Sequence, residues 1–189
     1  MSTTADSLAA DAMDVLKTAD CLHDAAAVQR TYMRLAAEIE RVYTDLNPLL
    51  LCVMTGGLHA TAALSERLPF ALEIDYLHAT RYRGQTSGGG LVWKRQIDPQ
   101  RLQGRHVLVV DDILDEGHTL VEIRKALTAF DPASLRVAVL AEKLHDRRAA
   151  GAHAEFIGLQ VEDRYVFGCG MDYKEYWRQL PAIYAVKGM

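Results

Sequence analysis

Short, nearly unbroken runs of apolar residues are the feature that most restricts how this 189-residue chain can fold. Runs rich in Leu and Val lie at residues 49–54, 105–110 and 135–140. A strand with apolar side chains on both faces is typical of a parallel sheet covered by helices. Segments with helical spacing of apolar residues alternate with these runs, and residues 23–43 are the clearest. This order predicts an α/β fold with right-handed crossovers and a mostly parallel central sheet flanked by helices.

The same patterns place the remaining elements and the domain limits. We expect further helices at 58–68 and about 119–130, and further strands at 70–76, 91–94, 155–158 and, as an edge segment, 165–168. Residues 81–90 hold four glycines and one large apolar side chain, Tyr82, which predicts a mobile loop. The first residues are expected to form a loose arm or a short helix. We therefore expect an N-terminal arm over 1–22 and a single domain over 23–189.

Composition and charge argue against several classes of protein. Half of the residues are hydrophobic and 24% are charged, which is ordinary for a compact globular domain. The net charge of −4, without a stripe of Lys and Arg, gives no support for nucleic-acid binding. No apolar run approaches the roughly 20 residues that cross a bilayer, and the N-terminus lacks the pattern of a signal peptide. Three distant cysteines favour a reducing cytoplasm, so we expect a cytoplasmic protein with no membrane or nucleic-acid partner.

Residues 107–120, VLVVDDILDEGHTL, carry the strongest functional signal. A buried strand ends in Asp111 and Asp112, and a helix is expected to begin a few residues later. Backbone amides at a helix start bind anions, Gly117 allows a close backbone approach, and Thr119 is expected at the capping position. Carboxylates beside an anion site suit a ligand that also offers hydroxyl groups or a metal ion. A ribose 5-phosphate has this combination.

Other phosphate and metal motifs do not match the chain. Ligands of parallel sheets bind at the carboxyl ends of the strands, which predicts that Thr55, Asp111 and Lys143 lie together. The sequence holds no Walker loop, and the glycine cluster at 88–90 is too irregular for a dinucleotide-binding fingerprint. The histidines lack zinc-site spacing, and Cys169 is expected to be a packing residue because no obvious base accompanies it.

With these pieces in order, the chain resembles the type I phosphoribosyltransferases, and over residues 49–180 the hypoxanthine-guanine phosphoribosyltransferases. The resemblance rests on LCVMTGG at 51–57, VVDDILDEGHT at 109–119, AEKL at 141–144 and DRYVFGCGMDYKEYWR at 163–178. The first two are shared by the whole type, whereas the last is specific to the branch that acts on 6-oxopurines. The resemblance implies a type I phosphoribosyltransferase fold with a mobile loop and a small hood formed from the N- and C-terminal segments.

The resemblance also implies an activity. Such enzymes transfer the 5-phosphoribosyl group from phosphoribosyl diphosphate to a purine, so we expect a purine salvage enzyme that makes IMP from hypoxanthine or GMP from guanine and releases diphosphate. Mg²⁺ is the implied cofactor, and a homodimer or homotetramer is the implied assembly. The ranking of hypoxanthine, guanine and xanthine stays open. The alternatives are a non-catalytic regulatory protein of the same fold that binds phosphoribosyl diphosphate or a nucleotide, and an enzyme for adenine, orotate or uracil, against which Lys143 argues.

By resemblance, residues 107–120 contact the ribose and its phosphate. Asp111 and Asp112 would hold the ribose hydroxyls and order Mg²⁺, and Asp172 would touch a second Mg²⁺. Asp115 would lie near the purine N7 as the catalytic base, with a pKa raised toward neutrality by neighbouring acids. The 5-phosphate would be bound by Asp115, Glu116, Gly117, His118 and Thr119.

The diphosphate and purine contacts are implied in the same way. Met54, Thr55 and Gly56 would form a diphosphate loop, in which relatives often have a non-proline cis peptide, and Arg178 would reach the diphosphate. Tyr82 would close over the reacting centre and exclude water. The purine would be bound by Lys143 at O6, by Tyr165 stacked on the ring, and by the backbone of Val166.

Three residues depart from the family pattern. Thr55 stands where many relatives have Lys, which removes a positive charge from the diphosphate loop. Glu116 replaces a hydroxyl residue, and its carboxylate at about 5 Å from a phosphate charge would cost roughly 3 kcal/mol, so we expect it to point away. His118 can compensate when protonated, because histidine changes charge near neutral pH. Binding of the sugar phosphate is therefore expected to weaken from about pH 6 to about pH 8.

Overall fold

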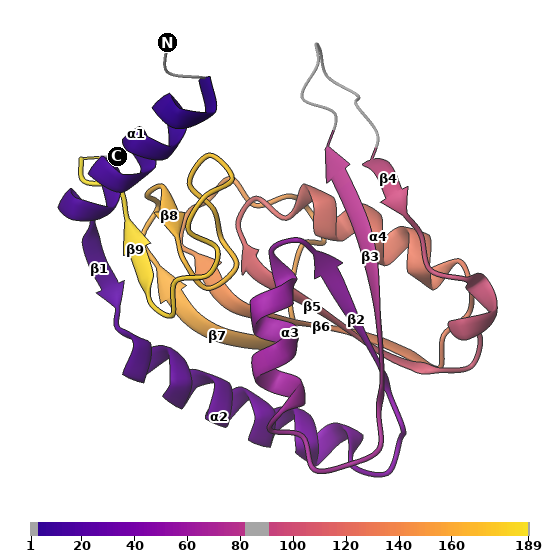
Figure 1. Ribbon diagram of the computed structural model, residues 1–189. Helices are drawn as coiled ribbons and strands as arrows, with labels where there is room; N and C mark the ends of the chain where they lie inside the picture. The colour runs from indigo at the N-terminus through magenta and orange to yellow at the C-terminus, as the bar shows by residue number, and fades with distance from the viewer. Residues whose placement is uncertain (1–3, 82–90, 189) are drawn as a thin grey trace.

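The computed structural model describes residues 4–81 and 91–188, and Figure 1 shows their arrangement. The helices in this part of the chain are α1 (Thr4–Thr18), α2 (Ala25–Tyr43), α3 (Gly57–Ser65) and α4 (His118–Thr128), with a short 3-10 turn at Pro99–Arg101. The strands are β1 (Asp20–His23), β2 (Leu49–Met54), β3 (Glu73–Arg81), β4 (Leu91–Arg95), β5 (His106–Leu114), β6 (Ser134–Lys143), β7 (Phe156–Val161), β8 (Val166–Phe167) and β9 (Ile183–Ala185). No helix of the described residues has the length and apolar character that a bilayer crossing requires.

The central sheet has the strand order β4-β3-β2-β5-β6-β7. All neighbouring strands from β3 to β7 run parallel, and β4 pairs with β3 in the antiparallel sense. The predicted mostly parallel sheet is thereby confirmed. The chain leaves β2 toward β3 on one side and leaves β5 toward β6 on the other. A crevice therefore forms at the carboxyl ends of β2 and β5, the place where open α/β sheets bind ligands.

Helices cover both faces of this sheet, as the unbroken apolar strands require (Figure 1). Leu50 and Leu108 face a core with α2 and α3, whereas the alternate residues Leu49 and Val107 face a second core with α4. The start of α2 is stabilised by the side chain of Asp24, which accepts a hydrogen bond of 2.7 Å from the backbone N–H of Ala27.

A small antiparallel sheet, β1-β9-β8, forms a hood beside the central sheet from segments near both ends of the chain (Figure 1). Helix α1 packs on this hood, where Ala12 and Phe167 are fully buried. The indole N–H of Trp177 donates a 2.8 Å hydrogen bond to the backbone oxygen of Ala12. Residues 4–18 are thus helical and packed on the hood, and the division of the chain at residue 22 stays a prediction.

Several boundaries differ from the predicted ones for physical reasons. The strand expected at 105–110 continues as β5 to Leu114, because Asp111 and Leu114 still pair with β6. The edge segment expected at 165–168 belongs to the hood, where β8 pairs with β9. Strands β1 and β9 were not predicted, since segments of 4 and 3 residues carry too little periodicity. Tyr82 and the rest of the predicted loop at 82–90 lie outside the described residues.

Candidate active site

A cavity of about 1090 Å³ opens at the carboxyl ends of β2 and β5. This volume is sufficient for a ligand of nucleotide size. The predicted site residues that line it are Thr55, Gly56, Asp111, Asp112, Asp115, Glu116, Gly117, His118, Thr119, Asp172 and Arg178. The cavity therefore brings together residues from β2, β5, the start of α4 and the segment that leads to β9.

The turn after β2 lies directly against the end of β5. The peptide bond between Met54 and Thr55 is cis, as the family resemblance implied. A Cβ atom on Gly56 would overlap the carboxylate of Asp112, and one on Gly57 would overlap the backbone oxygen of Val110. The two glycines are thus required for the close approach of this turn to the acidic end of β5.

Asp111 and Asp112 form a buried acidic pair at the end of β5. Each carboxylate accepts a hydrogen bond from the next backbone N–H, at 2.9 Å for Asp111 and 2.7 Å for Asp112. Burial raises the pKa of both carboxyl groups, and the charge of Asp112 raises the pKa of Asp111 further. The positive charge of Arg178 lowers both pKa values and only partly offsets these effects. Such a pair favours ligands with hydroxyl donors or positive charge.

The residues around this pair are compatible with Mg²⁺. The described residues hold no group of three or more His, Cys, Asp or Glu side chains arranged as a metal site. Mg²⁺ in phosphate-transferring sites is commonly held by one or two carboxylates together with substrate phosphates, so a complete protein cage is not needed. Two adjacent carboxylates whose negative charge is disfavoured by burial fit this mode of binding.

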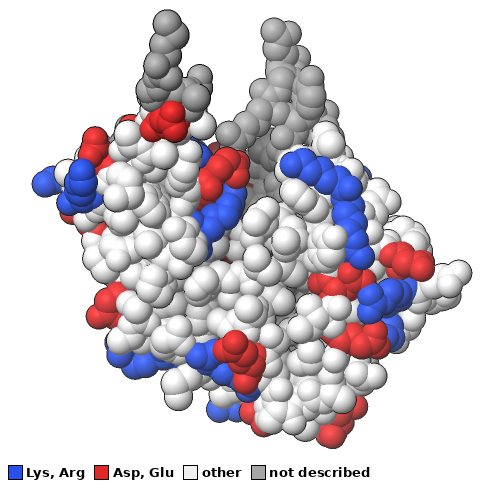
Figure 2. Space-filling view, viewed as in Figure 1, with Lys and Arg blue, Asp and Glu red and all other residues white. Residues whose placement is uncertain are grey.

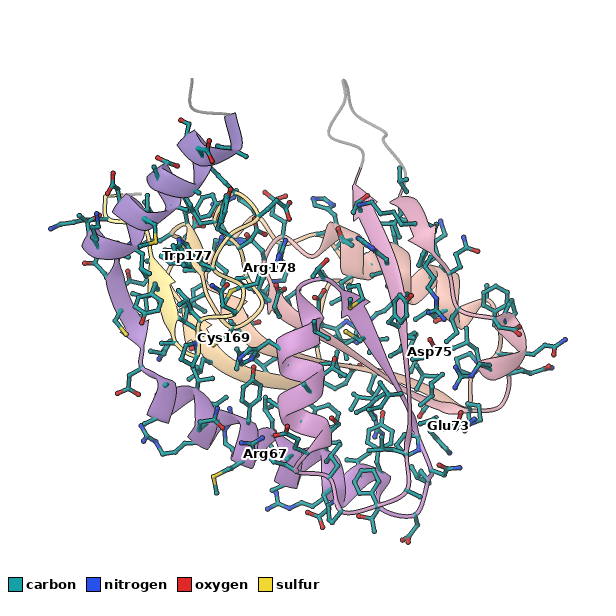
Figure 3. The ribbon with its side chains drawn as sticks, viewed as in Figure 1. Arg67, Glu73, Asp75, Cys169, Trp177 and Arg178 are labelled. Carbon is teal, nitrogen blue, oxygen red and sulfur yellow. The ribbon has the colours of Figure 1, made fainter. Side chains whose placement is uncertain are left out.

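Arg178 extends from the hood segment into the cavity (Figure 3). Its guanidinium group donates to the backbone oxygen of Gly170 at 2.8 Å and forms an ion pair with Asp172 at 2.7 Å. A second contact, at 3.2 Å, joins it to Glu175. A planar guanidinium held in this way can bind a phosphate or diphosphate oxygen in two-point fashion.

Asp115 is held between two donors from the other side of the site. Lys143 Nζ lies 2.7 Å from Asp115 Oδ2, and His145 Nε2 lies 2.7 Å from Asp115 Oδ1. Burial alone would raise the pKa of Asp115, but the hydrogen bonds from Lys143 and His145 outweigh it and lower the pKa below its usual value. The expectation that neighbouring acids raise this pKa is therefore wrong for the protein without substrate.

The start of α4 differs in one respect from the expectation. Gly117 is the N-cap, with a left-handed φ of 79°, and α4 begins at His118. Thr119 is consequently the second residue of the helix and not its cap. The Glu116 carboxylate lies 3.7 Å from His118 Nε2 and 3.9 Å from Arg147 Nε. Its orientation relative to a bound phosphate stays a prediction.

We expect Gly117→Ala to destabilise the fold, because a Cβ atom there would overlap Ala152 and lie 3.0 Å from Leu114 Cδ1 in addition to the strained φ. The expected loss is about 2–4 kcal/mol, which lowers Tm by roughly 5–15 °C. Thermal unfolding measures it. Gly151→Ala is the matched control, since Gly151 has a φ of 82° but no atom within 4 Å of its Cβ position. Equal losses in both variants would show that the overlap is unimportant.

The predicted purine contacts, Lys143, Tyr165 and Val166, are not among the residues that line the cavity. Lys143 reaches the cavity through Asp115, and Val166 is buried in the hood sheet with its backbone paired to Ala185. Tyr165 is 42% exposed and makes an edge contact with Tyr173 at 5.5 Å between ring centroids. A tyrosine exposed to this extent has a ring face available for stacking.

Several cavity residues were not predicted. His78, Thr80, Lys94 and Glu175 line the cavity, and His145 contacts Asp115. Lys94 lies on β4, and the sequence contains no signal for which strand β4 would pair with. The only sequence signal for His145 was its position two residues after Lys143. Cys169 is fully buried, and burial raises its pKa to about 12, which agrees with the expected packing role.

Charged side chains of both signs lie on the surface of the protein. On the face shown in Figure 2, basic and acidic side chains of the described residues are interspersed, and they are not gathered by sign.

Comparisons with known proteins agree with this geometry. The family model described as "Phosphoribosyl transferase domain" matches residues 18–175. A hypoxanthine-guanine-xanthine phosphoribosyltransferase of Tritrichomonas foetus is 37% identical over 160 residues, which cover 85% of this chain and 87% of the relative. A hypoxanthine-guanine phosphoribosyltransferase of Streptococcus pneumoniae (strain ATCC BAA-255 / R6) is 32% identical over 154 residues, or 82% and 85% of the two chains. A crystal structure of such an enzyme from Bacillus anthracis has a TM-score of 0.82 at 30% identity and covers 88% of this chain and 98% of its own.

Proposed function

This chain belongs to the phosphoribosyl transferase domain family, and from that premise we propose that it is a purine salvage enzyme. It transfers the 5-phosphoribosyl group from phosphoribosyl diphosphate to hypoxanthine or guanine and releases IMP or GMP and diphosphate. The observation that carries the proposal is the position of the Asp111–Asp112 pair in one cavity with Asp115, whose carboxylate is held by Lys143. Residues suited to bind the sugar, the phosphate and the purine therefore lie at one edge of the sheet.

In the proposed reaction a purine nitrogen forms a bond to C1 of the ribose while the bond from C1 to the diphosphate oxygen breaks. Asp111 and Asp112 accept hydrogen bonds from the ribose hydroxyls. The backbone amides of residues 115–119 bind the 5-phosphate, because the amides at the start of α4 are free to donate to an anion. The diphosphate is bound by Thr55, Gly56 and Arg178.

The purine is oriented by Lys143, Tyr165 and Val166, and its N7 proton passes to Asp115. The lowered pKa keeps Asp115 in the deprotonated form that can accept a proton, although it also makes the carboxylate a weaker base. Lys143 can donate to both Asp115 and the purine O6, since an ammonium group carries three hydrogens. A donor at O6 favours 6-oxopurines over adenine.

Mg²⁺ would be held by Asp111 and Asp112, with Asp172 near a second ion. When bound, it neutralises charge that develops on the diphosphate leaving group. The pair of buried carboxylates supports this assignment. The homodimer or homotetramer and the cytoplasmic location stay predictions.

Nucleotide formation tests the proposal directly. The protein is incubated with MgCl₂, phosphoribosyl diphosphate and one of hypoxanthine, guanine, xanthine or adenine, and product is followed by ultraviolet absorbance and chromatography. We expect rapid nucleotide formation from hypoxanthine and guanine and far slower formation from adenine. Omission of MgCl₂ with added chelator should abolish the product. Absence of product from every base would overturn the proposal and favour a regulatory protein of the same fold.

His118→Leu is expected to raise the Michaelis constant for phosphoribosyl diphosphate, because it removes the imidazole whose Nε2 lies 3.7 Å from the Glu116 carboxylate beside the proposed phosphate site. Steady-state kinetics measure the effect. His153→Gln, an exposed substitution, is the control. A Michaelis constant unchanged by His118→Leu would remove His118 from the phosphate site.

A further inference from the structure

His145 is a buried histidine that contacts the proposed base. Only 2% of its side chain is exposed, whereas 42% of the Asp115 side chain is exposed. The two oxygens of Asp115 are bound by different donors, Oδ1 by His145 Nε2 and Oδ2 by Lys143 Nζ, each at 2.7 Å. The carboxylate is therefore fixed in rotation by contacts at both of its oxygens.

The second ring nitrogen of His145 indicates which tautomer is present. The backbone N–H of Arg147 donates to His145 Nδ1 at 3.1 Å, so Nδ1 carries a lone pair. Nε2 then carries the hydrogen of the neutral ring and donates it to Asp115. Because Nε2 already holds a hydrogen, it has no site for the proton that Asp115 receives. His145 can orient the carboxylate in this arrangement, but it cannot relay a proton from it.

We propose that His145 is a positioning residue that holds Asp115 at Oδ1 and leaves Oδ2 to face the purine N7. This inference rests on the proposed function, in which Lys143 donates both to Asp115 and to the purine O6. Lys143 has a long, flexible side chain, and its contact with Asp115 Oδ2 weakens when it also donates to the purine O6. Only 2% of the His145 side chain is exposed, so its contact with Oδ1 is expected to persist while the other oxygen is released.

Several charged groups face Asp115 and contribute to the pH dependence of its charge. Lys143 and His145 contact it directly, Arg147 acts on it through its charge, and Glu116 and Asp163 lie beside Arg147. Burial raises the pKa of Asp115, and removal of the His145 donor takes away one of the two hydrogen bonds that lower it. The pKa of Asp115 is then expected to rise, and we expect an increase of about one unit.

Carbon-13 NMR titration of the Asp115 carboxyl group tests the proposal without any need for activity. The signal is assigned by its loss in Asp115→Asn. His145→Leu fills the space but has no donor, and its Asp115 midpoint should lie about one pH unit above wild type. His145→Gln retains an N–H donor and should titrate like wild type, as should the control His153→Gln. Equal midpoints in wild type and His145→Leu would overturn the proposal.

Kinetics of the same variants supply the second readout. His145→Leu should lower kcat about 10-fold and move the acidic limb of the pH profile of kcat/KM to higher pH. The KM for phosphoribosyl diphosphate should stay within about 2-fold of the wild-type value. His145→Gln should retain at least about half of the wild-type kcat. Equal kinetic losses in the Leu and Gln variants would show that His145 only fills space, and would overturn the proposal.

The design separates this proposal from the proposed function. A wild-type protein that makes no nucleotide contradicts the function, and the carboxyl titration still decides whether His145 holds Asp115. Thermal unfolding checks that each variant is folded. If His145→Leu does not fold, His145→Asn replaces it, because the shorter amide does not extend as far as the imidazole Nε2. An Asp115 midpoint unchanged in His145→Asn would then overturn the proposal.

Discussion

The Asp115→Asn variant is expected to form nucleotide about 100- to 10,000-fold more slowly than the wild-type protein, with a much smaller change in KM for phosphoribosyl diphosphate. Asparagine has nearly the same shape as aspartate, and its amide oxygen can still accept from Lys143 or His145. It cannot accept the purine N7 proton. The variant thus removes proton transfer while most of the binding contacts remain, which lowers kcat more than affinity.

Single-turnover and steady-state measurements with hypoxanthine separate the two effects. Asp146→Asn is the matched control, because Asp146 is an exposed acid near the site. The pKa of Asp115 is lowered in the protein, so wild-type activity should decline only as the pH falls into the acidic range where Asp115 becomes protonated. The Asn variant should lose this acidic limb. A turnover number unchanged by Asp115→Asn would exclude Asp115 as the base.

The sequence predicted several of the residues that meet at the sheet edge, but not how their charges interact. The apolar strands and the acidic ends are local patterns, so Thr55 and Asp111 could be placed together from strand topology alone. The partners of Asp115 are 28 and 30 residues away along the chain. Neighbours in the sequence suggested an acidic surrounding and a raised pKa, whereas neighbours in space are donors that lower it.

The hood illustrates a second limit of sequence reasoning. Strands β1 and β9 pair residues 160 or more positions apart, as Asp20 with Ala185. Neither strand is long enough to show a period of its own, and only the tertiary pairing stabilises them. The same applies to the start of α4, where the left-handed conformation of Gly117 makes it the cap in place of Thr119. Short elements and caps depend on contacts that no local pattern contains.

Lys143→Met is expected to have the second large effect, because Lys143 contacts the catalytic base Asp115 and is proposed to donate to the purine O6. The side chain is 13% exposed and forms its ion pair with Asp115 at 2.7 Å. Methionine has similar volume but no donor, so a 6-oxopurine loses its partner at O6. We expect the ratio of kcat/KM for hypoxanthine over adenine to fall about 100-fold or more, mainly through the loss of hypoxanthine turnover.

Loss of the ammonium group also changes the titration of Asp115. Burial raises the pKa of this carboxyl, and Lys143 is the first of the two donors that lower it, so the acidic limb of activity should move to higher pH in Lys143→Met. Lys143→Arg retains a positive charge and should keep the limb near its wild-type position, but its different geometry should still weaken the purine contact. Lys125→Met, an exposed substitution on α4, should change neither quantity. A different outcome is that Lys143→Met moves the acidic limb of the pH profile and leaves the ratio of kcat/KM for hypoxanthine over adenine unchanged. In that case Lys143 controls the pKa of Asp115, and another residue selects the purine.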